Sequence, residues 1–314
     1  LDKITLLGLL TLIGIIYYRL KWLGPEVKQG LHKLIFNLTL PLLIFNTVSR
    51  FDFTGELIGN GLLVFGLTYF FLALQYLMGW TSARIFKLPP RKGIVHMLHT
   101  VFGNVVFLGY PLIDALFPGT PALFYAASYH LAQTSVIWTL GVYQLSGSRS
   151  VGLFSNLKKL VNPNTIAFAA GMLFMLLQID LPAPIENTFR GLGGSTLYIS
   201  MIYIGMLIAE FSPKRSDLGW DNLAMILNKL IVAPLVITAI LWLLTGYAGI
   251  EMSLPAAGAL IMQTAMPCMA IMVILARNYG ADEKSAMVNV FFTTVLSLVT
   301  LPVIFWLLMR VFAS

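Results

Sequence analysis

The chain has 314 residues, of which 58% are hydrophobic and only 11% are charged. This composition excludes an ordinary soluble domain and predicts a polytopic membrane protein. Its single cysteine excludes an internal disulfide and a cysteine-rich metal site, and the net charge of +7 has to be interpreted from where Lys and Arg lie along the chain. We expect no cofactor, no bound metal and no nucleic-acid partner. The first apolar segment lacks a small-residue cleavage pattern, so no removable signal peptide is expected.

A helix needs about 20 apolar residues to cross a bilayer, and ten stretches of the chain meet this requirement. In the first half they cover residues 4–20, 31–48, 57–86, 96–117 and 122–145. In the second half they cover residues 163–179, 192–210, 223–247, 255–276 and 284–311. We therefore predict an all-α membrane protein with a five-helix repeat over 1–145, a cytoplasmic connecting loop over 146–159 and a second five-helix repeat over 160–314.

The distribution of positive charge orients these ten spans. If the loops alternate between the two sides, one face carries only Lys3, Arg50, Arg190 and Arg310, and the other carries the remaining 16 of the 20 Lys and Arg residues, Lys229 among them. Cytoplasmic loops are enriched in Lys and Arg, so both termini are predicted to lie outside the cell membrane. Because each half has an odd number of spans, the second repeat is predicted to be inverted relative to the first.

Helix breakers interrupt the fourth and the ninth spans. Gly109 and Pro111 are expected to open the fourth span, because proline removes a backbone donor and crowds the preceding turn. Met266, Pro267 and Cys268 interrupt the ninth span in the matching part of the second half. Paired interruptions of this kind indicate the substrate site of a secondary transporter near the middle of the membrane.

Several amides lie in otherwise apolar spans. They are Asn46, Asn104, Gln133, Gln263 and Asn289. A buried amide without partners is costly in hydrocarbon, so each should face the bundle interior or a wet cavity. Hydrogen bonding between helices explains most of them. The exception is Asn104, which lies about two turns before Pro111 on a broken span and is predicted to bind the substrate.

Few ionisable side chains fall within the spans. His130 lies three residues before Gln133 and is either a proton carrier or a hydrogen-bonded structural histidine; with Asn289 it is the candidate for ion coupling. His96 and His99 are expected near the cytoplasmic end of the fourth span. No acidic residue falls at the midplane, so tight coupling to protons or sodium is not indicated. We predict no catalytic residue, because an intramembrane hydrolase would need a nucleophile and a base or paired aspartates at the midplane, and Asp114 is expected near the outer end of its span.

Four segments, in order and spacing, resemble the auxin efflux carrier family, which includes the plant PIN-FORMED carriers and bacterial permeases described as malate or malonate transporters. Residues 104–112 resemble its Asn-x-x-x-x-Gly-x-Pro-Leu crossover, and Asn162-Pro163 resembles the opening of its second repeat. Residues 41–45 resemble its second-helix motif, and 265–280 resemble its second crossover with the Ala-Arg/Lys-x-Tyr tail. The resemblance covers nearly the whole chain.

The resemblance implies a fold like that of sodium/proton antiporters and bile-acid carriers. Helices 1, 2, 6 and 7 would form a scaffold, helices 3–5 and 8–10 a transport domain, and the scaffold a possible homodimer contact. Such a protein works as an elevator, in which the transport domain carries the substrate past the scaffold. Only residues 146–159 join the halves, whereas many plant members have a long loop at this position. The short connection favours a prokaryotic protein that carries a small organic acid.

The resemblance also implies substrate contacts. Asn104 matches the crossover asparagine near the substrate carboxylate, Pro111 and Pro267 match the crossover prolines, and Gln133 matches a fifth-span glutamine. Two further candidates differ from the plant carriers, in which a tyrosine stands at Trp138 and a histidine at Asn46.

A mechanism follows from the two opened helices. The N-termini of half-helices attract an anion through free amides and their positive dipole ends. Asn104 and Gln133 would donate to the carboxylate, and Met266, Cys268 and Trp138 would supply apolar contact. Export of a monoanion is downhill by about 2.3 kcal/mol per 100 mV of membrane potential. The alternatives are a proton- or sodium-coupled dicarboxylate symporter, an exporter of auxin-like aromatic acids and, less favoured, a channel or a ligand sensor.

Overall fold

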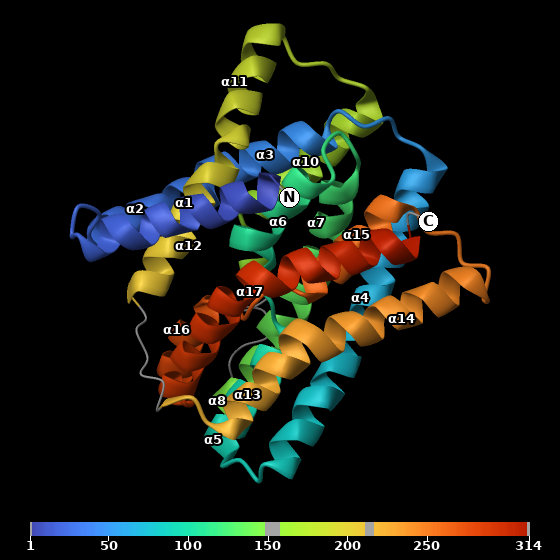
Figure 1. Ribbon diagram of the computed structural model, residues 1–314. Helices are drawn as coiled ribbons and strands as arrows, with labels where there is room; N and C mark the ends of the chain where they lie inside the picture. Colours follow the sequence, from blue (N-terminus) through green and yellow to red (C-terminus); the bar gives the residue numbers. More distant parts are fainter. Residues whose placement is uncertain (1, 148–157, 211–216, 313–314) are drawn as a thin grey trace.

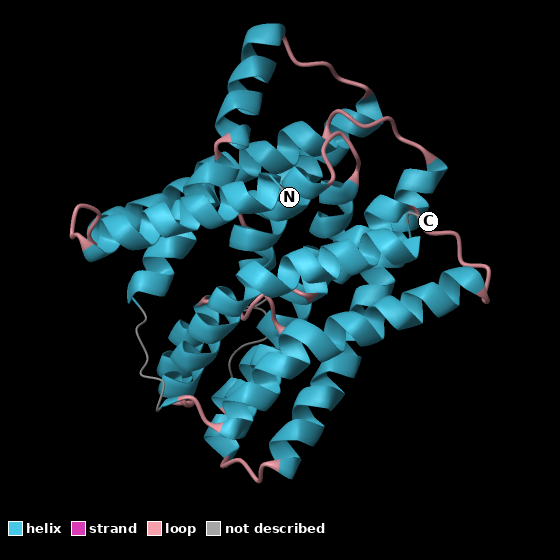
Figure 2. Ribbon diagram, viewed as in Figure 1, coloured by secondary structure: helices cyan, strands magenta, loops and turns pink. Residues whose placement is uncertain are grey.

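The computed structural model describes residues 2–147, 158–210 and 217–312. Apart from one isolated β-bridge, these residues form only helices, turns and loops (Figure 1, Figure 2). The all-helical fold class is therefore confirmed. Most of the predicted connecting loop, residues 148–157, lies outside the described residues, and the remainder includes a 3₁₀ turn, η4 (Lys158–Leu160).

The first half of the chain consists of helices joined by short turns and three π-helical segments. They are α1 (Asp2–Arg19), α2 (Pro25–Leu34), η1 (Ile35–Thr39), α3 (Leu40–Val48), α4 (Gly55–Ile85), α5 (Pro90–Val101), η2 (Val105–Gly109), α6 (Tyr110–Leu116), α7 (Ala122–Val136), η3 (Ile137–Gly141) and α8 (Val142–Ser146). The π-helical segments η1, η2 and η3 each continue directly into an α-helix.

The second half is built in the same manner. Its elements are α10 (Pro163–Leu177), α11 (Ala183–Gly194), α12 (Thr196–Glu210), α13 (Trp220–Leu227), η6 (Asn228–Val232), α14 (Ala233–Gly246), α15 (Leu254–Thr264), α16 (Ile271–Tyr279) and α17 (Glu283–Phe312). The start of α10 is fixed by a capping box: the Asn162 side chain accepts from the amides of Asn164 and Thr165, and the Thr165 hydroxyl accepts from the amide of Asn162.

Among the described residues, five helical segments are long and apolar enough to cross a membrane. They are Pro25–Val48, Gly55–Ile85, Ala183–Glu210, Trp220–Gly246 and Glu283–Phe312. Shorter apolar helices lie at Leu6–Arg19, Val105–Leu116, Pro163–Leu177 and Leu254–Thr264. Large apolar side chains such as Leu62, Val299 and Trp306 point outward. Their exposure matches helices that face lipid.

The helices form two groups of neighbours. In one group α1 packs along α12, and α3 packs against α10 and α11 (Figure 1). The contact between α1 and α12 brings backbones together, because a Cβ on Gly14 would meet the Ile202 carbonyl and a Cβ on Gly205 would meet the Thr11 carbonyl. In the other group α4 packs against α5 and α7, and α15 packs against α7. Helix α12 also contacts η2, α6 and α17, which belong to the second group.

Candidate functional site

Two interruptions of the helices meet inside the protein. Residues 102–104 separate α5 from η2, and residues 265–270 separate α15 from α16. The backbones pair where they cross, with an antiparallel bridge between Gly103 and Cys268. The amide of Asn104 donates to the Pro267 carbonyl at 2.7 Å, and the amide of Met269 donates to the Phe102 carbonyl at 3.2 Å. We call these two segments the crossing point. Backbone donors and acceptors that lack intrahelical partners in one segment form hydrogen bonds with the other segment.

The predicted opening at Gly109 and Pro111 is wrong. The chain leaves the helix earlier, after Val101, and both residues lie in helical structure. The segment η2 is a π-helix, closed by a bond from the Gly109 amide to the Asn104 carbonyl at 3.1 Å, and Pro111 falls in the first turn of α6. A proline is tolerated at this point because the irregular turn before it needs no regular α-helical donor.

Asn104 begins the second half of the broken span. Its Oδ1 accepts a hydrogen bond from the Phe107 amide at 3.3 Å and so caps η2. Among the described residues, its Nδ2 has no hydrogen-bond partner. The side chain lines a small pocket, whose other walls are α12, with Ile204 and Leu207, and α17, with Thr294. Asn104 therefore combines a fixed position with a donor group that is free to bind a ligand.

A larger cavity adjoins this pocket and shares Ile204 and Thr294 with it. Its lining is mostly aliphatic and aromatic, with Leu112 of α6, Met262 of α15 and Phe305 of α17 among its residues. The hydroxyl groups at its edge include those of Thr294 and Ser297. A ligand that reached from Asn104 into this cavity would pass from a polar end to an apolar one.

Gln133 holds the crossing point and does not line either of these cavities. Its Nε2 donates to the Gly103 carbonyl at 3.2 Å, and its Oε1 accepts from the Gly103 amide at 3.4 Å. The side chain is fully buried on α7. Since both ends of the amide are already bonded to the backbone of Gly103, we interpret Gln133 as a residue that positions the crossing point.

Gln263, which the sequence marked only as a buried amide, lies against the same half-helix. Its Nε2 donates to the carbonyls of Val105 and Ala126, each at 3.5 Å, and its Oε1 has no partner among the described residues. A Cβ at position 109 would collide with this oxygen. Gly109 therefore provides the space that Gln263 occupies, a role that residue spacing does not indicate.

The remaining crossing-point candidates are buried. Met266 and Cys268 are fully buried, and Cys268 donates its amide to the Thr293 hydroxyl at 3.1 Å. The Cys268 thiol lies 3.6 Å from the His99 carbonyl. Trp138 of η3 is only partly buried and packs against an apolar cluster that includes Phe102. These contacts stabilise the crossing point from the side of α5 and α17.

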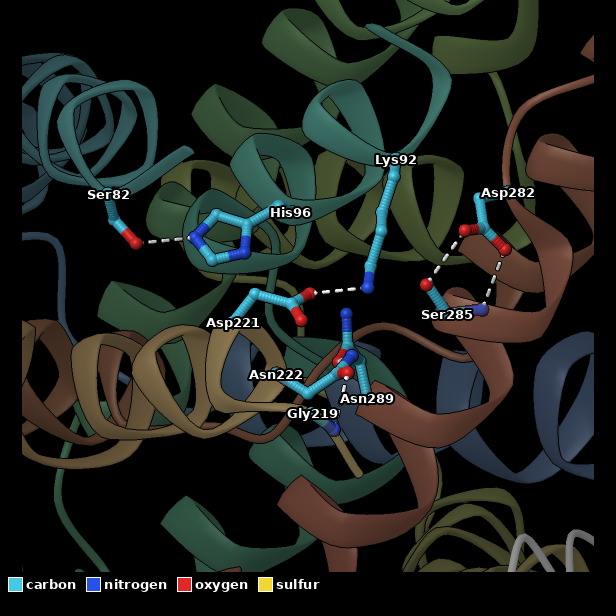
Figure 3. A network of polar contacts seen from close by, with 9 residues as sticks. All are labelled: Ser82, Lys92, His96, Gly219, Asp221, Asn222, Asp282, Ser285 and Asn289. Atoms are coloured by element: carbon cyan, nitrogen blue, oxygen red, sulfur yellow. Dashed lines mark hydrogen bonds and ion pairs between the residues drawn. The ribbon is translucent and has the colours of Figure 1, made fainter. Parts of the chain in front are cut away.

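His130, Asn46 and Asn289 lie apart from the pocket of Asn104. The Nδ1 atom of His130 and the hydroxyl of Tyr110 are 2.8 Å apart, and both side chains are buried, which is the geometry of a structural hydrogen bond. Asn46 is buried in α3. Asn289 of α17 accepts from the Asn222 side chain at 2.8 Å (Figure 3). In the part of the chain that the structure describes, the one hydrogen bond linking these three residues toward the crossing point is that from the Thr293 hydroxyl to the Asn289 carbonyl.

A polar network ties α13 to its neighbours (Figure 3). Lys92 of α5 forms an ion pair with Asp221 of α13 at 2.7 Å, and the His96 Nε2 lies 2.6 Å from the Ser82 hydroxyl of α4. His96 and His99, expected near the cytoplasmic end of the fourth span, are both buried. The His96 ring faces α4, and among the described residues neither ring nitrogen of His99 has a hydrogen-bond partner.

The prediction that placed Lys229 on the cytoplasmic face is also wrong. Its side chain is 0% exposed, and its Nζ donates to the Val101 carbonyl at 3.0 Å and to the Gln75 Oε1 at 3.3 Å. The π-helical segment η6 carries Lys229 inward, toward the end of α5. With Lys229 removed, the predicted face keeps 15 of its 16 cations. A lysine within an apolar span was the sequence signal for this site.

These features define a multi-pass membrane protein. Several apolar helices have membrane-spanning length, two interrupted segments meet among them, and a pocket lies beside the point where they meet. A family model described as "Membrane transport protein" (Mem_trans) matches residues 3–151 and 145–305. The chain belongs to this family, which confirms the resemblance to the auxin efflux carriers.

Two curated proteins are similar to nearly the whole chain. A protein of Methanothermobacter thermautotrophicus named "Uncharacterized transporter" is 27% identical over 294 residues, which cover 93% of each chain. An uncharacterized transporter of Methanocaldococcus jannaschii is 24% identical over 319 residues, which cover 99% of each chain. The protein is therefore a membrane transporter of this family.

Proposed function

We propose that the protein is a secondary transporter that moves a small organic carboxylate anion across the cell membrane, with the anion bound beside the crossing point. The observation that carries the proposal is Asn104. Its Nδ2 has no partner among the described residues and its side chain lines a pocket, while its Oδ1 caps the continuous helix Val105–Leu116. The start of that helix adds a positive dipole end, so the pocket offers an anion both a donor and a favourable field.

The position of the pocket supports an elevator mechanism. One wall is α12, which packs with α1, and the other walls belong to the crossing point and α17. Across the same boundary Phe107 of η2 lies against Tyr203 of α12, with ring centroids 5.3 Å apart. We propose that α1–α3 and α10–α12 form the scaffold, and that the other helices move past it with the anion.

The direction of transport follows from charge. Neither segment of the crossing point contains an Asp or a Glu, the residues that commonly bind a coupling cation in a membrane. An uncoupled monoanion would leave a negatively charged interior, gaining about 2.3 kcal/mol per 100 mV. We therefore propose that the membrane potential drives efflux of the anion. We further propose that both termini of the chain lie on the outer side of the membrane and that two copies form a dimer through the scaffold.

The apolar cavity favours a second substrate class over the dicarboxylates. The cavity lined by Leu112, Met262 and Phe305 has no charged side chain that could bind a second carboxylate. It suits an acid with one carboxylate and an apolar or aromatic body, of which indole-3-acetate is an example.

The test is flux into proteoliposomes. Labelled malate, malonate and indole-3-acetate would be offered with a potassium-diffusion potential alone and then with a pH gradient alone. We expect transport of at least one acid to follow the potential, to saturate and to show exchange with unlabelled acid. A strict requirement for the pH gradient would replace uncoupled efflux by proton coupling, and flux without saturation or exchange would identify a channel.

A further inference from the structure

Lys229 is a fully buried cation without an acidic partner. Its Nζ has two acceptors, the Val101 carbonyl at 3.0 Å and the Gln75 Oε1 at 3.3 Å, and no carboxylate of the described residues forms an ion pair with it. A buried charge is costly unless its neighbours compensate it. The buried charge of the Lys229 ammonium must therefore be stabilised by its neighbours, and the end of α5 contributes to this stabilisation.

The ammonium lies at the C-terminal end of a half-helix. Helix α5 ends at Val101, one residue before the crossing point. The last carbonyls of a helix lack intrahelical partners, and this end of the helix dipole is negative, so it favours a cation. In transporters with broken helices, such half-helix C-termini and unwound carbonyls are the groups that hold a coupling sodium ion or proton.

The other neighbours of Lys229 are suited to a cation as well. Gln75 of α4 presents its amide oxygen to the ammonium while its Nε2 donates to the Phe71 carbonyl at 3.2 Å. The ammonium therefore faces two neutral oxygens, the Gln75 Oε1 and the Val101 carbonyl, and neutral oxygens are also the ligands that a bound monovalent cation takes.

We propose that Lys229 is a tethered cation: its ammonium occupies the place, at the end of α5, where a coupling cation would otherwise bind and hold the crossing point together. The protein would then keep its crossing point assembled with no dissolved cation. This inference deepens the proposed function, since it explains how an uncoupled anion carrier keeps a geometry that coupled carriers obtain from a bound ion.

The first test measures thermal stability in detergent and needs no substrate. Lys229→Ala opens a space beside the Val101 carbonyl, and Lys229→Met fills it with an apolar chain. Melting would be followed in equal concentrations of choline, sodium and methylammonium chloride. We expect methylammonium or sodium to raise the melting temperature of Lys229→Ala by about 2–4 °C over choline, and to leave the wild type and Lys229→Met unchanged. Lys284→Ala, at an exposed ion pair with Asp217, is the matched control and should not respond.

Two results would overturn the proposal. In the first, Lys229→Ala melts at the same temperature in all three salts, or it fails to fold in any of them although Lys229→Met does fold. The other is a wild type that sodium itself stabilises over choline, because its site would then be open to dissolved ions.

A second variant tests the charge directly, even where substitution of Lys229 prevents folding. Gln75→Glu places a carboxylate beside the ammonium, so it should be tolerated with Lys229 present and destabilising in the Lys229→Met background. Equal destabilisation in both backgrounds would contradict a cation at this position. In proteoliposomes, wild-type transport should be equal in sodium and choline, whereas Lys229→Ala should require sodium or methylammonium. If the wild type moves none of the offered acids, the proposed function fails while the stability results still decide the role of Lys229.

Discussion

The side-chain amide of Gln133 forms two hydrogen bonds with the backbone of Gly103, accepting from its N–H at 3.4 Å and donating to its carbonyl at 3.2 Å. Gly103 is also the residue whose backbone bridges to Cys268. A single side chain of α7 therefore fixes the position at which the two broken segments cross.

Replacement of Gln133 by leucine should destabilise the protein. The change leaves two buried backbone groups of Gly103 without these partners, at a cost of about 1–3 kcal/mol. Melting in detergent would measure the loss, and the exposed Gln29→Leu in α2 serves as the control. If Gln133→Leu kept its stability and lost only its affinity for the anion, Gln133 would bind the substrate and not the backbone.

Substitutions of Asn104 should distinguish its role as a helix cap from its role in anion binding. Asn104→Asp keeps an oxygen for the Phe107 amide but replaces the free Nδ2 by a negatively charged oxygen. We expect Asn104→Asp to remain folded and to lose carboxylate binding, because its charge repels the anion.

Asn104→Ala is the complementary variant. It should lose carboxylate binding and also about 1 kcal/mol of stability with the cap. Titration of purified protein with the transported acid, together with melting curves, would measure both effects. Unchanged affinity in Asn104→Asp would remove Asn104 from the site.

Gly109 should not tolerate a methyl group. A Cβ there would collide with the Gln263 Oε1, so we expect Gly109→Ala to lose about 1–3 kcal/mol of stability. Gln263→Ala should relieve the collision, so the double variant should be more stable than the sum of the two single changes implies.

The matched control for Gly109→Ala is Gly66→Ala. This helical site in α4 has open space around it, and alanine there should be neutral or stabilise by about 0.5–1 kcal/mol. Equal effects of alanine at positions 66 and 109 would contradict the proposed contact with Gln263.

His130 should prove structural. Tyr110→Phe and His130→Leu each break the same buried hydrogen bond, so their effects on stability should overlap and the double variant should cost less than the sum. His130→Gln should retain transport with the wild-type dependence on pH, measured as the initial flux at several pH values. Loss of the pH dependence in His130→Gln alone would make His130 the proton carrier.

The sequence by itself determined the class of this protein and its family. Apolar runs of membrane-spanning length leave helices as the available structure, because backbone groups in lipid must bond within their own segment. Four segments, at 41–45, 104–112, 162–163 and 265–280, indicated the family by their order and spacing, and the helix breakers in two of them marked the functional region.

Tertiary structure alone decided how the breaks and polar groups are used. The chain opens at 102–104 and not at Pro111 because the opposing segment offers carbonyl and amide partners there. The Gln133 side chain bonds to the backbone of Gly103, and the Gln263 side chain occupies the space beside Gly109. The Lys229 side chain is buried and bonds to the end of α5. Hydrogen-bond partners and buried charges depend on neighbours more than 25 residues away in the chain, and local sequence carries no information on which of them will come together.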